Sequence, residues 1–66
     1  MTDNGYIVEY QRVGLIVKVT AIDPDSGTEA VIQGPANAGE HALAQAAVKK
    51  LEFLLRKKHK NDVDEK

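Results

Sequence analysis

The sequence predicts a single small α+β domain, in which a three-stranded antiparallel β-meander is followed by one C-terminal helix packed on one face of the sheet. Three observations predict this class. Residues 6–13 and 15–22 alternate along the chain with the two-residue period of a strand. Turn signals at residues 12–14 and 23–27 separate three extended segments. From residue 38 onward Pro is absent, and apolar residues recur at helical spacing.

Length and composition restrict the possible classes of protein. The chain has 66 residues, of which 42% are hydrophobic and 29% charged, as in globular domains. It contains no Cys, which excludes disulfides, thiolate chemistry and zinc sites built on Cys. No apolar run is long enough to cross a bilayer, and the polar start predicts no signal peptide. We therefore expect a cytoplasmic protein with one domain over residues 1–60 and a disordered tail over residues 61–66.

The first two strands are expected to form a hairpin that closes at residues 12–14, where Gly14 accepts a backbone conformation that other residues avoid. Pairing Arg12 with Leu15 sets Glu9 opposite Lys18, a favourable cross-strand pair. The same pairing gathers the large apolar side chains on one face of the sheet. With two residues of the third strand, this face comprises Tyr6, Val8, Tyr10, Leu15, Val17, Val19, Ala21, Ala30 and Ile32.

The remaining elements are predicted from turn-forming and helix-capping residues. Asp, Pro and Gly at residues 23–27 predict a turn, and residues 28–33 predict the third strand. Asn37 is a favourable N-cap and Glu40 can complete a capping box, so a helix is expected from there to about Lys58. Its apolar stripe comprises Ala44, Ala47, Val48, Leu51, Leu54 and Leu55.

One helix covers only one face of a three-stranded sheet, so the other face is expected to carry apolar side chains in water. Short domains bury little surface, and without disulfides association is an obvious further source of stability. We therefore predict a small non-catalytic interaction module that contacts itself or another protein, as a homodimer in the first case. The expected contact residues are Ile7, Ile16, Ile22 and Val31 on the sheet, with Phe53 as a separate candidate on the helix.

A basic block in the helix favours an alternative function. Residues 49–60 contain six basic side chains and a single acid, Glu52, although the whole chain has a net charge of −1. Such a block can contact the phosphates of nucleic acid, or it can simply complement the partial negative charge at a helix C-terminus. The candidate contact residues are Lys49, Lys50, Arg56, Lys57, Lys58 and Lys60.

No set of residues indicates a reaction. His41 and His59 each lack a second His, a Cys or paired carboxylates at ligand spacing, so no metal site is expected. Ser26 is the single Ser, and it stands in a predicted turn without a base beside it. We expect no catalytic residue, no cofactor and no small-molecule substrate, and no membrane among the partners.

Several short segments carry a family resemblance. They are residues 12–14 (RVG), 17–23 (VKVTAID), 27–29 (GTE), 34–36 (GPA) and 50–52 (KLE). Together they resemble a family of small uncharacterised alphaproteobacterial proteins, a domain of unknown function of about 60 residues, over about residues 6–58. The resemblance implies a bacterial, cytoplasmic setting and one compact domain. It implies no activity, cofactor or site residue.

Overall fold

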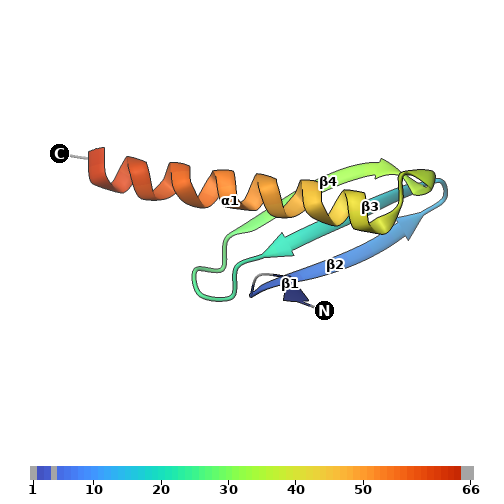
Figure 1. Cartoon of the computed structure of the whole chain (residues 1–66), viewed down its shortest axis with the longest axis horizontal. Coiled ribbons are helices and arrows are strands. Elements are labelled where there is room, and N and C mark those ends of the chain that lie inside the picture. Colours follow the sequence, from blue (N-terminus) through green and yellow to red (C-terminus); the bar gives the residue numbers. More distant parts are fainter. Residues whose placement is uncertain (1, 4, 65–66) are drawn as a thin grey trace.

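The computed structural model is an antiparallel sheet with one long helix packed on one of its faces (Figure 1). It describes the backbone of residues 2–3 and 5–64, and the side chains of residues 5–57. The strands are β1 (Thr2–Asp3), β2 (Tyr6–Val13), β3 (Ile16–Ile22) and β4 (Glu29–Pro35), and they lie in the sheet in chain order. A 3-10 turn, η1 (Ala36–Ala38), leads into helix α1 (Glu40–Asp64). The predicted β-β-β-α fold is confirmed, with the two-residue β1 as an addition on the outer edge of β2.

The β2–β3 hairpin has a register different from the predicted one. Val13 pairs with Ile16, so the two-residue loop is Gly14-Leu15 instead of Val13-Gly14. Gly14 has a φ of 63°, and Gly at the first loop position suits a tight hairpin turn. The Arg12 Nε donates a hydrogen bond of 2.8 Å to the Gly14 carbonyl within this turn. Every predicted pair therefore shifts by two residues, which keeps the side chains on their predicted faces.

Two predictions about individual side chains are wrong as a result of this register. Glu9 lies opposite Thr20, and Lys18 lies opposite Gln11, so Glu9 and Lys18 are not a direct cross-strand pair. Leu15 occupies the loop and is 77% exposed instead of lying in the core. The cause is the same in both cases, since moving the turn forward by one residue takes Leu15 out of β3.

The core lies between α1 and the strands β3 and β4. Its buried members come from β2, β3, β4 and α1, and they are Val8, Val17, Val19, Ala21, Ala30, Leu43, Ala44, Ala47, Val48 and Leu51. Tyr6, Ile32, Leu54 and Leu55 pack against this cluster and are partly buried. Because α1 packs on β3 and β4, it leaves β2 at the side of the helix (Figure 1). Tyr10, predicted to be covered, is consequently 37% exposed.

The junction between sheet and helix also differs from the expected one. Asn37 lies within η1, whose N-cap is Pro35, and α1 begins three residues later at Glu40. The Gly39 carbonyl accepts from the Leu43 amide at 3.2 Å, which places Gly39 at the N-cap position with a φ of 92°. A side chain would disfavour that φ, so the chain changes direction at Gly39 and not at Asn37.

The far end of α1 continues beyond its predicted end near Lys58. Its backbone is helical to Asp64, and its C-terminal part projects past the sheet (Figure 1). Of residues 61–66, the expected disordered tail, residues 61–64 belong to this helix and residues 65–66 lie outside the described residues. Neither Pro nor Gly, the two strongest helix breakers, occurs after Gly39.

The 23–27 turn satisfies its own polar groups. The Asp23 carboxylate accepts from the Ser26 hydroxyl at 2.8 Å and from the Asp25 amide at 3.3 Å. The Gly27 amide donates to the Asp23 carbonyl at 2.7 Å, and the Ser26 hydroxyl also contacts the Thr28 hydroxyl at 2.8 Å. The Asp and Ser side chains of this turn thus have a structural role as hydrogen-bonding partners within it.

Helix and sheet approach each other closely at Gly34. A Cβ built on Gly34 would lie 2.5 Å from Cδ2 of the buried Leu43. We therefore expect Gly34→Ala to lower the free energy of unfolding by about 1–3 kcal/mol through overpacking. Chemical denaturation measures this loss. In the Leu43→Ala background the atoms that crowd the added methyl are gone, so there Gly34→Ala is expected to cost little, and equal losses in both backgrounds would contradict the contact.

The corrected position of Leu15 gives a second test of the fold. Leu51 is fully buried, whereas Leu15 is 77% exposed in the hairpin loop. Leu51→Ala is expected to lower the free energy of unfolding by about 2–5 kcal/mol, because it leaves a cavity. Leu15→Ala is expected to change it by less than about 0.5 kcal/mol. Thermal denaturation of both variants checks the pair, and a large loss at Leu15 would restore the predicted register.

Candidate interaction surface

The face of the sheet opposite α1 is the candidate interaction surface, and we call it the open face. Cross-strand pairing arranges its side chains in four rows across β2, β3 and β4. Row one is Ile7, Ile22 and Glu29; row two is Glu9, Thr20 and Val31; row three is Gln11, Lys18 and Gln33; row four is Val13, Ile16 and Pro35. Each of these side chains is either exposed or half-buried.

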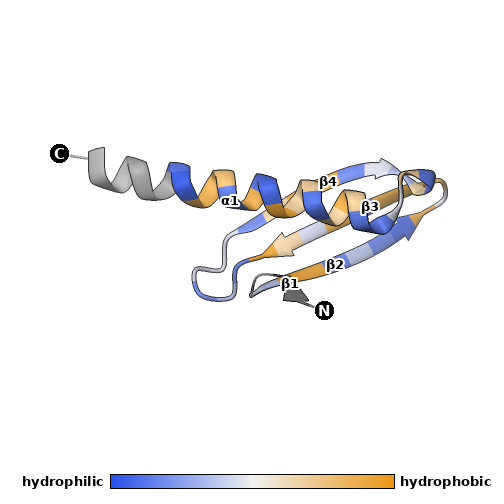
Figure 2. Cartoon of the chain, viewed as in Figure 1, coloured by the Kyte–Doolittle hydropathy of each residue, from blue (hydrophilic) through white to orange (hydrophobic). Residues whose placement is uncertain are grey.

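The rows differ in polarity along the strands. Rows one and four are mainly apolar, and Figure 2 shows β2 as hydrophobic near its start and hydrophilic through its middle. Rows two and three carry one acid, Glu9, and one base, Lys18, which lie in adjacent rows on adjacent strands. A shallow hollow of about 630 Å³ lies over this polar centre and is lined by Glu9, Tyr10, Gln11, Lys18 and Thr20. The open face thus has two apolar ends and a charged, recessed centre.

The structure brings some of the predicted contact residues together and separates others. Ile7 and Ile22 are directly paired in row one and are half-buried, as is Val31 in row two. Ile16 lies at the other end of the open face and is 45% exposed. Phe53 is 55% exposed on α1, which packs on the opposite face of the sheet, so it belongs to a separate surface.

Sequence reasoning missed the apolar exposure around the β2–β3 hairpin. Val13 is 66% exposed beside Ile16 in row four, and Leu15 extends from the loop that joins their strands. The alternation of residues 6–13 places Val13 on the open face, which was the available signal. Only the observed Gly14-Leu15 loop pairs Val13 with Ile16 and so groups the exposed apolar side chains at this end of the sheet.

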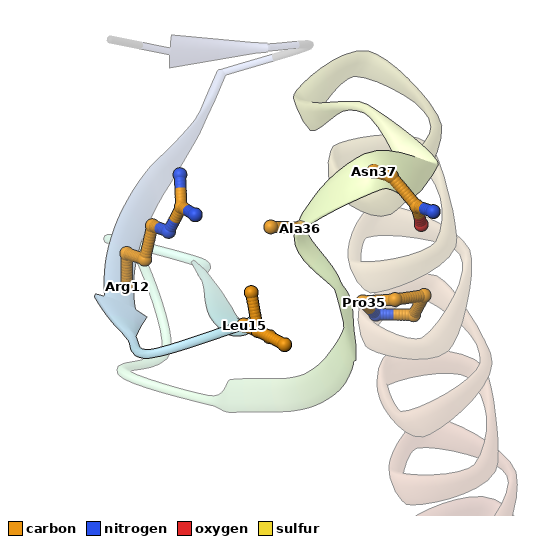
Figure 3. Close-up of a pocket in the computed structure, with 5 residues that line it drawn as sticks. All are labelled: Arg12, Leu15, Pro35, Ala36 and Asn37. Carbon is orange, nitrogen blue, oxygen red and sulfur yellow. The ribbon is translucent and has the colours of Figure 1, made fainter.

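A second hollow, of about 430 Å³, lies at the hairpin and is lined by Arg12, Leu15, Pro35, Ala36 and Asn37. Figure 3 shows Arg12 and Leu15 on the hairpin side of the gap and Ala36 across from them. The Ala36 amide donates to the Leu15 carbonyl at 2.8 Å and holds the two walls together. Its volume lies in the range of ligand sites, but its described lining offers a guanidinium and an amide without a nucleophile or a general base.

The predicted basic residues lie along α1, away from the open face. Lys49, Lys50, Arg56 and Lys57 are exposed, whereas the side chains of Lys58 and Lys60 lie outside those the structure describes. The Lys50 Nζ donates to the Val31 carbonyl of β4 at 2.9 Å. These four described cations stand three and four residues before and after Phe53, so on a helix they all neighbour its ring.

Metal-ligating groups form no cluster in the described part of the chain. Among those residues, no group of three or more His, Cys, Asp or Glu could hold a metal ion. His41 is exposed in the first turn of α1. No helix of the described part is sufficiently long and apolar to cross a membrane.

Comparison with known proteins assigns the chain to a family. Residues 3–58 match the family model described as Domain of unknown function (DUF6898). The chain belongs to this family. The match covers β2 to β4 and most of α1, and it includes the open face and Phe53. No curated protein and no solved structure gives a significant match to the chain.

Proposed function

We propose that this member of the DUF6898 family is a small non-catalytic protein-interaction module that binds another protein surface through its open face. The observation that carries the proposal is the placement of the core. The buried cluster lies between α1 and the sheet, so the apolar side chains of rows one and four contribute nothing to it. Val13 and Ile16 instead stand exposed at one end of a continuous face.

Protein interfaces combine an apolar contact area with charged groups, usually at the rim, that select the partner and its orientation. The open face has this composition, with Ile7 and Ile22 at one end, Val13 and Ile16 at the other, and Glu9 and Lys18 between them. We further propose the cytoplasm of an alphaproteobacterium as the setting, and the segments quoted in the sequence analysis support it.

Substitution at the open face tests the proposal. Ile16→Glu places a carboxylate in row four without touching the buried cluster, so we expect the fold to persist and partner binding to be lost. Phe53→Glu is the matched control, since Phe53 is similarly exposed but lies on α1. Affinity capture with wild-type and variant chains, followed by mass spectrometry, gives the comparison. A set of bound proteins that Ile16→Glu leaves intact would overturn the proposal.

One observation favours a second candidate function, the binding of single-stranded nucleic acid by α1. An exposed aromatic ring among basic side chains is the arrangement in which a base stacks while cations contact the phosphates. Phe53 supplies the ring and Lys49, Arg56 and Lys57 supply the nearest cations, with Lys50 engaged at the β4 edge. The net charge of −1 opposes this function at long range.

Binding to oligonucleotides over a range of salt concentrations tests the second candidate. With about three phosphate contacts, the logarithm of the affinity for a single strand should fall with the logarithm of salt concentration with a slope of about −2. Phe53→Ala is expected to weaken single-strand binding more than duplex binding, because only unstacked bases reach the ring. Fluorescence anisotropy provides the measurement. No affinity for either form at low salt would eliminate this candidate.

A further inference from the structure

The open face is self-complementary under one particular symmetry. We infer that its partner is a second copy of this chain, related by a twofold axis that crosses the strands between rows two and three. This inference rests on the proposed function, and it adds the identity and the orientation of the partner.

The polarity of the rows selects this axis. When two copies pack face to face about an axis across the strands, row one meets row four of the second copy, and row two meets row three. Ile7 then meets Val13, and Ile22 meets Ile16, so the apolar ends cover each other. Glu9 comes beside Lys18 of the second copy, because these residues lie in adjacent rows on adjacent strands.

The other face-to-face axis is unfavourable. An axis along the strands sets each row against itself, and it places Lys18 directly opposite Lys18 of the second copy, because β3 is the middle of the three strands that form the face. Like charges in a partly desolvated contact weaken association, whereas opposite charges support it. The crossing axis replaces that repulsion with two Glu9–Lys18 pairs, one on each side of the axis.

Edge-to-edge association covers less of the exposed apolar surface. At the free edge of β4, the Val31 carbonyl is already bonded to Lys50 at 2.9 Å. At the other edge of the sheet, β1 pairs with Tyr6 and Ile7 at the start of β2. An edge contact would also leave rows one and four in water. The hollow over Glu9 and Lys18, by contrast, provides room for the long side chains of a second open face.

The size of the open face sets the expected strength of the dimer. Three strands spaced by about 4.8 Å, each of seven residues rising about 3.4 Å, give a face about 14 Å wide and about 24 Å long. Two such faces cover about 670 Å² in total, less than the ~1,000 Å² of a stable specific interface and in the range of a weak, transient contact. We therefore expect a reversible dimer with a dissociation constant on the order of 10 μM.

Exchange of the two charges provides the decisive experiment. Glu9→Lys and Lys18→Glu each create like-charge contacts across the axis, and each is expected to weaken the dimer by about tenfold or more. In a mixture of the two variants, every charged contact across the axis joins a basic side chain of the first variant to an acidic side chain of the second, so dimerisation should return to near the wild-type level. Mixing cannot repair a repulsion within one chain. Sedimentation equilibrium of each variant and of the mixture measures the association.

A matched pair of substitutions at Gln11 keeps the test independent of the first two variants. Under the crossing axis Gln11 lies opposite Glu9 of the second copy. Gln11→Lys should therefore strengthen the dimer, and Gln11→Glu should weaken it. Gln45→Ser, at an exposed position of α1 on the other side of the molecule, should leave the association unchanged. Circular dichroism verifies that each variant is folded.

Each outcome decides the inference separately from the proposed function. The crossing axis is supported if dimerisation returns in the mixture, Gln11→Lys strengthens the dimer and Gln11→Glu weakens it. If the wild-type chain dimerises and none of these charge substitutions changes its dissociation constant, the proposed orientation is wrong. A wild-type chain that stays monomeric into the millimolar range overturns self-association, yet the proposed function stands if Ile16→Glu removes a captured protein. If the chain stays monomeric and Ile16→Glu also leaves the captured proteins unchanged, the proposed function is wrong as well.

Discussion

The packing of a single helix on a broader sheet determines the rest of this structure. Ala44 and Ala47 allow α1 to approach β3 and β4 closely, and the contact of Leu43 with Gly34 locates the helix along the sheet. A helix about 10 Å across buries Val8 of β2 but not Tyr10 on the same strand, and it cannot reach the other face. The exposed side of Tyr10 and the whole open face are direct consequences of this limited coverage.

Periodicity in the sequence predicted which side chains share a face, but it could not predict which residues lie opposite each other. A shift of two residues leaves every side chain on its face, so the hydrophobic pattern is equally compatible with both registers of the hairpin. The geometry of the Gly14 turn decides between them, and it separates Glu9 from Lys18 and exposes Leu15. The backbone preferences of Gly14 and Gly39 determine where the hairpin turns and where α1 begins, and the hydrophobic pattern does not contain this information.

The candidate surface was predictable in outline for the same reason. Ile7, Ile16, Ile22 and Val31 share the open face as the alternation predicted, and none of them is buried. Their relative exposure depends on tertiary position, since Ile16 lies beside the hairpin and Ile7 lies between β1 and β3. The rows that give the face its apolar ends and charged centre depend on the register. The hydrophobic pattern alone does not determine that register.

The bond from Lys50 to the Val31 carbonyl has a consequence for uncontrolled polymerisation. An unpaired edge strand offers its main-chain groups to any extended peptide. Copies that join edge to edge in a head-to-tail manner propagate without limit into fibrils. Here a flexible ammonium from the helix occupies an acceptor in the middle of β4, and Pro35 removes a donor near the end of the same strand. These two features leave fewer main-chain groups of β4 free to pair with an extended strand of another chain.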